Sequence, residues 1–234
     1  MWEHVYEVSS VASLQIIIKH FEQYPLETTK IIHFKLWCRV VNMVLNKEHL
    51  TKEGFMRILS IKAVFPKGLN KSITTAYPNI NPIIKPEFRP NTGKLNPHWI
   101  AGFSQADYSF GLHPVKRANK KLGYAIMPSY RITQHERDLV VLTRVLQTLG
   151  CGGLVKPAAD RDRYHISVSS SKDLITIIIP FFKIYRFYGA KWLDFDNFCE
   201  GMEIIKNKGH LTQEGLDSLK KLAYSMNTYR KLGD

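Results

Sequence analysis

The segment Trp99–Phe110, with the sequence WIAGFSQADYSF, combines helical spacing, small residues and an acidic residue. The Asn-Pro pair that precedes it is suited to cap and begin a helix, which we predict to continue through Asp107. Gly102 and Ala106 are four residues apart and therefore share one helix face, where they allow a second helix to approach closely. The segment thus predicts a helix with a small-residue packing face and a carboxylate at its end.

Hydrophobic alternation and turn residues predict two hairpins and a helix after this segment. Strands are expected at 109–116 and 124–133, joined by the basic turn 116–121. A helix is expected at 135–149, followed by a second hairpin of strands at 153–156 and 163–168. With the helices that follow, the chain from residue 97 reads α-β-β-α-β-β-α plus two further helices.

Two segments of the chain are similar in sequence at an offset of 161 residues. Such a match indicates an internal repeat. Lys47–Phe55 and Lys208–Leu216 are identical at six of nine positions, and residues 8 to about 70 recur as 168 to about 230. Each copy predicts three helices, at 11–24, 28–46 and from Thr51, and at 171–185, 190–207 and from Thr212. Glycines early in the third helices, Gly54 and Gly215, indicate close packing because glycine costs helix propensity.

The two copies differ in what precedes them. Residues 97–167 precede the second copy, whereas residues 1–7 precede the first. We therefore expect that the front of the first repeat is missing, although an insertion at 97–167 would give the same pattern. Proline density predicts a linker at 77–96, so the expected organisation is a partial first repeat at 1–76, this linker, and a complete second repeat at 97–234.

Composition favours a nucleic-acid partner. Thirty-three Lys and Arg residues against twenty Asp and Glu give a formal net charge of +13, which suits a polyanion. Three scattered cysteines fit neither a disulfide framework nor a zinc site and indicate a reducing compartment. The apolar run Leu174–Phe182 is far shorter than the ~20 residues of a membrane span, so no membrane association is expected.

Residues 99–110 resemble the LAGLIDADG homing-endonuclease signature, W-[IL]-x-G-F-x-[DE]-[AG]-[DE]-G-[SC]-F. Further segments resemble motifs of the same family in the same order: Tyr130–Asp138, Tyr164–Ser170, Gly189–Phe195 and Met226–Thr228. The resemblance implies an α+β fold of tandem repeats, each αββαββα, with the first repeat truncated to its last strand and helices. It also implies an organellar, intron-encoded protein, most often mitochondrial.

The resemblance implies divalent-metal-assisted hydrolysis of double-stranded DNA, with Mg²⁺ as the expected ion. Asp107 would be the metal ligand. Gln134 would position solvent near the scissile phosphate, and Lys191 with its repeat partner Lys30 would lie at the edge of the active site.

The family lays the concave face of its sheets along the major groove of DNA, where a two-stranded ribbon fits. This face would use alternate residues of 109–118, 124–134, 153–156 and 163–167. The predicted DNA-binding residues are His113, Lys116, Arg117, Lys120, Lys121, Arg131, Arg137, Lys156, Arg161 and Arg163.

The sequence departs from the family at Gln105, where the first acid is usual, and at Tyr108, where glycine is usual. Three functions therefore remain open: a site-specific endonuclease, a maturase-like protein that binds its host intron RNA, and a remnant of a mobile element. A monomer is expected, and self-association through the 97–107 helix would supply a second aspartate.

Overall fold

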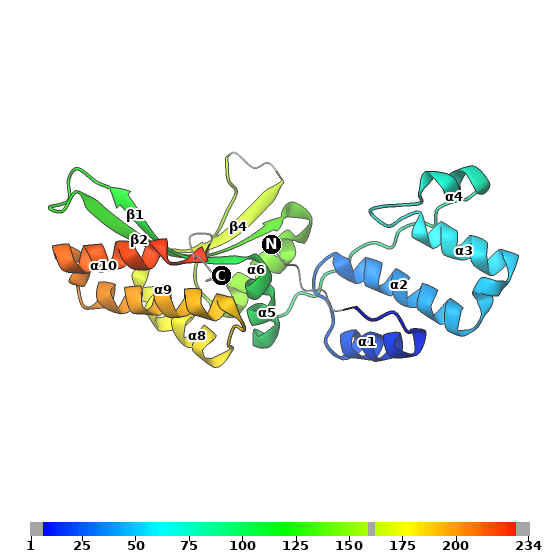
Figure 1. Ribbon diagram of the computed structural model, residues 1–234, viewed down its shortest axis with the longest axis horizontal. Helices are drawn as coiled ribbons and strands as arrows, with labels where there is room; N and C mark the ends of the chain where they lie inside the picture. The colour runs from blue at the N-terminus through cyan, green and yellow to red at the C-terminus, as the bar shows by residue number, and fades with distance from the viewer. Residues whose placement is uncertain (1–6, 159–161, 228–234) are drawn as a thin grey trace, which may run out of the picture. The chain divides into compact units, whose positions relative to one another are not determined.

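The computed structural model describes residues 7–158 and 162–227, and for Asp107 and Tyr108 it describes the backbone alone (Figure 1). The chain divides into two compact units, Met1–Asn91 and Thr92–Asp234. Among the described residues, no helix combines the length and the apolar character that crossing a membrane requires.

The first unit consists of helices. They are α1 (Val11–Gln23), α2 (Lys30–Leu45), a 3₁₀ turn η1 (Glu48–Leu50), α3 (Lys52–Lys62) and α4 (Lys71–Ala76). Ile32, Leu36, Met43 and Ile61 form a buried cluster. The three predicted helices are confirmed, and α4 was not predicted.

The strand expected at the front of the first unit is not formed in its described part, residues 7–91. Val8, the repeat counterpart of Val168, lies in irregular chain before α1. The physical reason is that a strand is stabilised by pairing with neighbours, and residues 7–91 contain no second strand to pair with.

The boundary between the units falls inside the segment 77–96. Ile83 and Phe88 pack against the buried cluster of the first unit, and the Ile83 N–H donates to the Ser60 carbonyl at 3.2 Å. Leu95, by contrast, is buried in the core of the second unit. Three apolar side chains, Ile83, Phe88 and Leu95, therefore anchor this proline-rich segment to the two units, while most of its other residues are exposed.

The second unit is a four-stranded antiparallel sheet with helices gathered on one face (Figure 1). Along the chain it comprises α5 (Pro97–Asp107), β1 (Tyr108–Lys116), β2 (Tyr124–His135), η2 (Glu136–Asp138), α6 (Leu139–Leu149), β3 (Gly153–Val155) and β4 (Arg163–Val168). It continues with α7 (Ser171–Asp173), a π-helical turn η3 (Leu174–Ile178), α8 (Ile179–Ile184), α9 (Ala190–Lys206), η4 (Gly209–Leu211) and α10 (Gln213–Tyr224). The strand order is β1-β2-β4-β3. The expected α+β fold, with both hairpins and the 97–107 helix, is confirmed.

Every second residue of the strands points into the core. Phe110 on β1, Tyr130 and Ile132 on β2, and Ile166 on β4 are fully buried under the helices. Since neighbouring residues of a strand point to opposite faces, the remaining residues of each strand form a second face that no helix covers (Figure 1).

The internal repeat is visible in the backbone. Lys47 and Lys208 both adopt left-handed conformations, with φ of 58° and 59°. The hydroxyls of Thr51 and Thr212 then cap α3 and α10 by accepting from Gly54 and Gly215 N–H groups at 3.0 and 3.1 Å. The two copies therefore share one helix-turn-helix geometry that the matching sequences specify.

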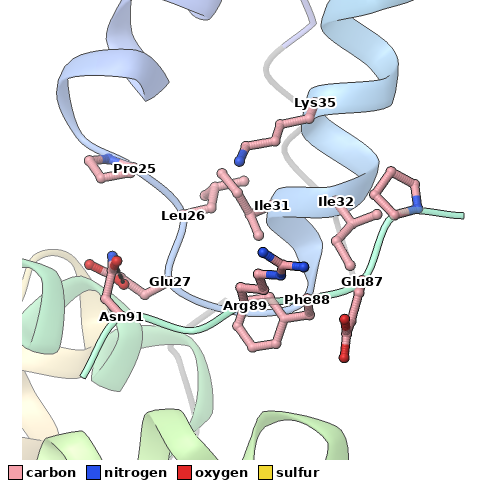
Figure 2. A pocket seen from close by; sticks show the side chains of 11 residues that line it. Pro25, Leu26, Glu27, Ile31, Ile32, Lys35, Glu87, Phe88, Arg89 and Asn91 are labelled. Atoms are coloured by element: carbon pink, nitrogen blue, oxygen red, sulfur yellow. Dashed lines mark hydrogen bonds between the residues drawn. The ribbon is translucent and has the colours of Figure 1, made fainter.

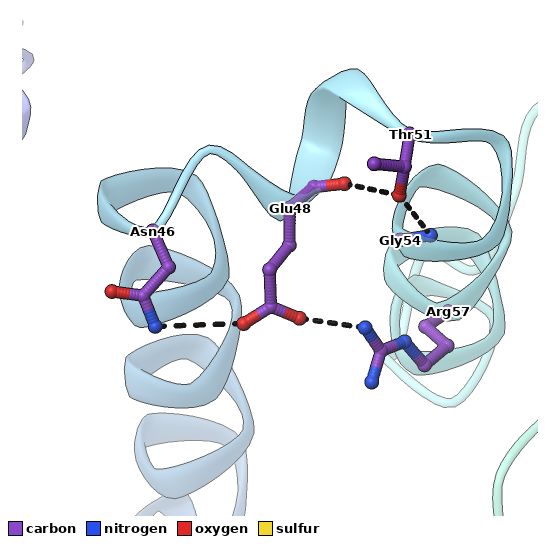
Figure 3. A network of polar contacts seen from close by, with 5 residues as sticks. All are labelled: Asn46, Glu48, Thr51, Gly54 and Arg57. Carbon is purple, nitrogen blue, oxygen red and sulfur yellow. Dashed lines mark hydrogen bonds and ion pairs between the residues drawn. The ribbon is translucent and has the colours of Figure 1, made fainter.

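The turns differ at one position of the repeat. Glu48 accepts from Arg57 at 2.6 Å and from Asn46 at 3.5 Å (Figure 3), whereas its counterpart Gly209 has no side chain. In the second copy, Asn207 donates to Glu203 instead, at 3.1 Å. The shared turn geometry thus rests on the threonine cap and not on the glutamate network.

Candidate nucleic-acid interface and catalytic site

Arg131 lies at the centre of the uncovered sheet face. The strand register places it between Ser109 on β1 and Ser167 on β4, and the row ends at Gly153 on β3. Its direct neighbours across the sheet are small, and Arg131 is exposed. Arginine in such a position can donate two hydrogen bonds to a base edge or a phosphate.

His113 lies over the buried Ser129 on the same face. Its Nε2 is 3.1 Å from the Ser129 hydroxyl oxygen, and Ser129 pairs with Gly111 across the hairpin. A Cβ atom on Gly111 would collide with the His113 ring. The absence of a side chain at Gly111 therefore lets the imidazole lie flat enough to reach the neighbouring strand.

The positive charge of Arg131 affects the pKa of two histidines. Burial, and then the positive charge of Arg131, lower the pKa of both His113 and His165 from the ordinary value of 6.5. Both imidazoles are therefore neutral near pH 7, where each ring can donate one hydrogen bond and accept another. The centre of the face thus combines one permanent cation with two neutral, polar rings.

The basic turn forms the end of the β1–β2 hairpin. Lys116, Arg117, Lys120 and Lys121 are all exposed there. Arg163 lies on the uncovered face opposite His135. These cations place further positive charge at the tip of the β1–β2 hairpin and at the start of β4, where they can contact phosphates.

The three other predicted DNA-binding residues are Lys156, Arg137 and Arg161. The Lys156 Nζ is 5.0 Å from the centre of the Tyr164 ring, and Arg137 in η2 is 3.8 Å from the Asp138 carboxylate with an exposed side chain. Arg161 falls outside the described residues.

Asp107 ends α5, and Gln134 lies near the end of β2. The residue after Asp107 pairs with Ile132, so the antiparallel register brings Gln134 to the same end of the sheet. Gln134 is partly buried and is engaged in contacts within the fold. The backbones of Asp107, the predicted metal ligand, and Gln134, the predicted solvent-positioning residue, therefore lie at the same end of the sheet.

The start of α9, with Lys191, is tied to α5 by a pair of hydrogen bonds. The Gln105 Nε2 donates to the Tyr188 carbonyl, and the Tyr188 N–H donates to the Gln105 Oε1, both at 3.1 Å. Lys191 follows three residues later and is also engaged in contacts. Lys30 begins α2 of the first unit and is exposed.

The motif residues Asp194 and Asn227 have a structural role. The Asn227 N–H donates to the Asp194 Oδ1 at 3.1 Å, and its Nδ2 donates to the Phe110 carbonyl at 2.8 Å. Asp194 is buried. These bonds hold the segment after α10 against β1 and α9. Asp194, the acidic residue of the Gly189–Phe195 motif, therefore has a structural role.

A divalent metal fits the chemistry of the predicted ligand. Among the described side chains there is no cluster of three His, Cys, Asp or Glu residues. Mg²⁺, however, is commonly held by one or two carboxylates together with substrate phosphates and water. A carboxylate at the end of α5, at the same end of the sheet as Gln134, is compatible with that mode.

A cavity of about 310 Å³ lies in the first unit, between the α1–α2 connection, α2 and residues 86–91 (Figure 2). Leu26, Ile31 and Phe88 are among its apolar lining, and Lys35 and Arg89 carry positive charge. Asn91 donates to Glu27 at 3.2 Å. None of the residues predicted to be functional lines this cavity.

Three residues of these sites were not among those selected from the sequence. Alternation along 163–167 is the signal that could have indicated His165, which the sequence-based prediction did not name. Ser129 carries no comparable signal. Gln105 and Tyr188 are 83 positions apart, so the local sequence does not predict their contact.

The chain matches the family model described as LAGLIDADG endonuclease over residues 3–41 and 100–202. It is 31% identical over 217 residues to the probable intron-encoded endonuclease 3 of Neurospora crassa, covering 93% of this chain. The chain spans 40% of the length of that relative.

Solved structures show the same fold. The LAGLIDADG homing endonuclease I-SmaMI bound to cleaved DNA is 34% identical, with a TM-score of 0.89 over 95% of this chain and 74% of that one. I-LtrWI bound to target DNA is 35% identical, with a TM-score of 0.88 over 96% of this chain and 74% of that one. I-SmaMI has also been solved with an uncleaved target in the presence of calcium ions.

Proposed function

The chain belongs to the LAGLIDADG endonuclease family, and from this membership we propose that it binds double-stranded DNA and hydrolyses a phosphodiester bond at a specific site. The observation that carries the proposal is the uncovered sheet face with Arg131 at its centre. Asp107, the last residue of α5, directly precedes the first strand of this sheet. The complexes of I-SmaMI with cleaved DNA and of I-LtrWI with target DNA support the DNA substrate.

In the proposed reaction, Asp107 holds a divalent cation, with Mg²⁺ as the expected ion. When bound, the cation lowers the pKa of a water molecule and stabilises charge on the scissile phosphate. Gln134 orients solvent at the same end of the sheet. Lys191 at the start of α9, and Lys30 at the start of α2, donate to phosphate or water at the edge of the site.

Recognition of DNA uses the second face of the sheet. Arg131, His113 and Arg163 contact base edges or phosphates in the major groove. The hairpin cations Lys116, Arg117, Lys120 and Lys121 contact phosphates and position the duplex. Arg137, Lys156 and Arg161 contribute positive charge around the face.

A second LAGLIDADG helix is needed to complete the site. Gly102 and Ala106 are exposed on α5, and a Cβ on Gly102 would meet nothing within 4 Å. A helix can therefore approach closely at this face. We propose that another copy of α5, or an equivalent helix, docks there and supplies a second carboxylate.

The proposed setting is an intron-encoded protein of mitochondrial origin. The relative in Neurospora crassa is named a probable intron-encoded endonuclease, and the resemblance to organellar proteins of this family supports the rest.

The proposal is tested by incubating purified protein with a randomised double-stranded DNA library and Mg²⁺, beside the variant Asp107→Asn. Cleavage at one recovered sequence that the variant abolishes would support the endonuclease. If the protein cuts no sequence, yet binds nucleic acid with strong salt dependence, the endonuclease proposal is wrong. An intron-splicing assay would then examine a role in binding the host intron RNA.

A further inference from the structure

The side chain of Gln105 is paired with the backbone of a single residue, Tyr188. One amide nitrogen donates to the Tyr188 carbonyl, and the amide oxygen accepts from the Tyr188 N–H, both at 3.1 Å. The Tyr188 side chain itself is 76% exposed. The contact therefore depends on the chemistry of residue 105 and not on the ring of residue 188.

A primary amide is the group that this contact requires. The peptide backbone of Tyr188 offers one acceptor and one donor, and glutamine supplies one of each. An ionised glutamate could accept from the N–H but could not donate to the carbonyl, which would then face a carboxylate oxygen. Gln105, a departure from the acid usual in the family signature, is thus matched to its partner.

The connection that Gln105 holds leads directly into α9. On one side of Tyr188, Phe187 is buried and stacks on Phe182 at 4.5 Å between ring centres. On the other side, Gly189 turns the chain with a φ of +66°, a conformation that favours glycine, and Lys191 follows in the first turn. The segment is consequently fixed at Phe187 by the core and at Tyr188 by α5.

We propose that Gln105 is a positioning residue that fixes Lys191 relative to the last turn of α5, where Asp107 lies. This proposal rests on the proposed function for its catalytic consequence. The hydrogen bonds join the last turn of the signature helix to the segment that begins α9. Releasing them allows the start of α9 to shift, and displacements of about 1 Å in a reacting site reduce rates by up to about a hundredfold.

Hydrogen exchange of the 186–190 segment tests the contact without any need for activity. The variants are Gln105→Ala and Gln105→Glu, and the matched control is Gln147→Glu, which makes the same charge change at an exposed position of α6. We expect exchange at the Tyr188 amide to be about fivefold faster in Gln105→Ala, as the loss of one hydrogen bond implies. The control should match the parent.

The pH dependence of Gln105→Glu gives a second reading. Near pH 8 the glutamate is ionised and should exchange like Gln105→Ala. Once the pH falls below the ordinary glutamate pKa of about 4.3, a protonated carboxyl can again donate to the Tyr188 carbonyl, so exchange should move towards that of the parent when both are compared at the same pH. A variant that merely disturbs the packing of α5 would show no such recovery.

The catalytic consequence is tested on a DNA site recovered from the randomised library. We expect Gln105→Ala to lower the single-turnover cleavage rate in Mg²⁺ by about tenfold or more, while binding of the same DNA in Ca²⁺ changes by less than about twofold. Faster exchange with unchanged cleavage would overturn the positioning role. Equal exchange in all variants would overturn the contact itself. If the parent cuts no DNA, the proposed function and the positioning role both fail, while the exchange data still decide whether the contact exists.

Discussion

The hydroxyl oxygen of Ser104 lies 2.7 Å from the phenolic oxygen of Tyr130, and both side chains are fully buried. This hydrogen bond joins α5 to β2 inside the core. It fixes the rotation of the signature helix against the sheet.

Removing either partner of this bond should destabilise the second unit. Ser104→Ala removes one hydrogen-bond partner of the buried tyrosine hydroxyl, and Tyr130→Phe removes the partner of the buried serine hydroxyl, so each should lower the free energy of unfolding by ~1–3 kcal/mol. The double variant should cost less than the sum of the two single variants. Urea denaturation of the four proteins measures this double-mutant cycle, and strictly additive losses would contradict a direct bond.

Alanine substitution should have opposite effects at two helical glycines. A Cβ on Gly215 would collide with the Gly209 carbonyl, so Gly215→Ala should destabilise the protein by ~1–3 kcal/mol. Gly102→Ala meets open space and should stabilise α5 by up to ~1 kcal/mol through helix propensity. Thermal unfolding of both variants makes the comparison. Equal effects at the two positions would show that the turn before α10 relaxes to admit a side chain.

The hairpin lysines should contribute to DNA binding without regard to sequence. Lys120→Ala and Lys121→Ala should each lower the slope of log affinity against log salt concentration by about one, because each removes one phosphate contact. Fluorescence anisotropy with a non-specific duplex at several salt concentrations measures the slopes. Lys67→Ala, in the other unit, serves as a comparison of equal charge change. A loss of the same size there would mean that net charge alone governs binding.

Stability should decrease on acidification because of the two histidines near Arg131. Their pKa values are lowered in the folded protein from 6.5, so protonation favours the unfolded chain. The stabilisation is fully present above pH 6.5 and is lost as the pH falls through the lowered values. The free energy of unfolding should therefore be smaller at pH 5.5 than at pH 7.5, as chemical denaturation at each pH will show.

Arg131→Gln provides the control for this pH effect. Removing the guanidinium charge should raise the pKa of His113 and His165 towards 6.5 and reduce the loss of stability at acid pH. NMR titration of the imidazole protons follows each histidine directly. A pH dependence that stays the same in this variant would show that the Arg131 charge does not set it, and that burial of the histidines or other groups do.

Cys199 and Cys151 should react slowly with thiol reagents. Burial raises the pKa of both thiols to about 11, so little thiolate exists near neutral pH. Modification by a chromogenic disulfide should become rapid only on unfolding. Fast reaction of the native protein would contradict the buried environment.

The local sequence by itself determined many of the helices and strands, although not α4. The Asn-Pro start and the residue spacing predicted the helix that the structure places at Pro97–Asp107, alternation predicted both hairpins, and the repeat predicted that Thr51 and Thr212 would cap equivalent helices. Each of these features depends on residues within a few positions of one another, because caps, turns and periodic burial are short-range properties of the chain.

The tertiary structure alone decided which distant groups meet. Gln105 bonds to Tyr188, and Asn227 bonds to the carbonyl of Phe110, across 83 and 117 positions. Val8 lies in irregular chain and not in the expected strand, and Ile83 and Phe88 pack against the core of the first unit. Such contacts depend on how helices and strands are brought together in three dimensions, and residue spacing along the chain carries no information about the partner of a single amide or ring.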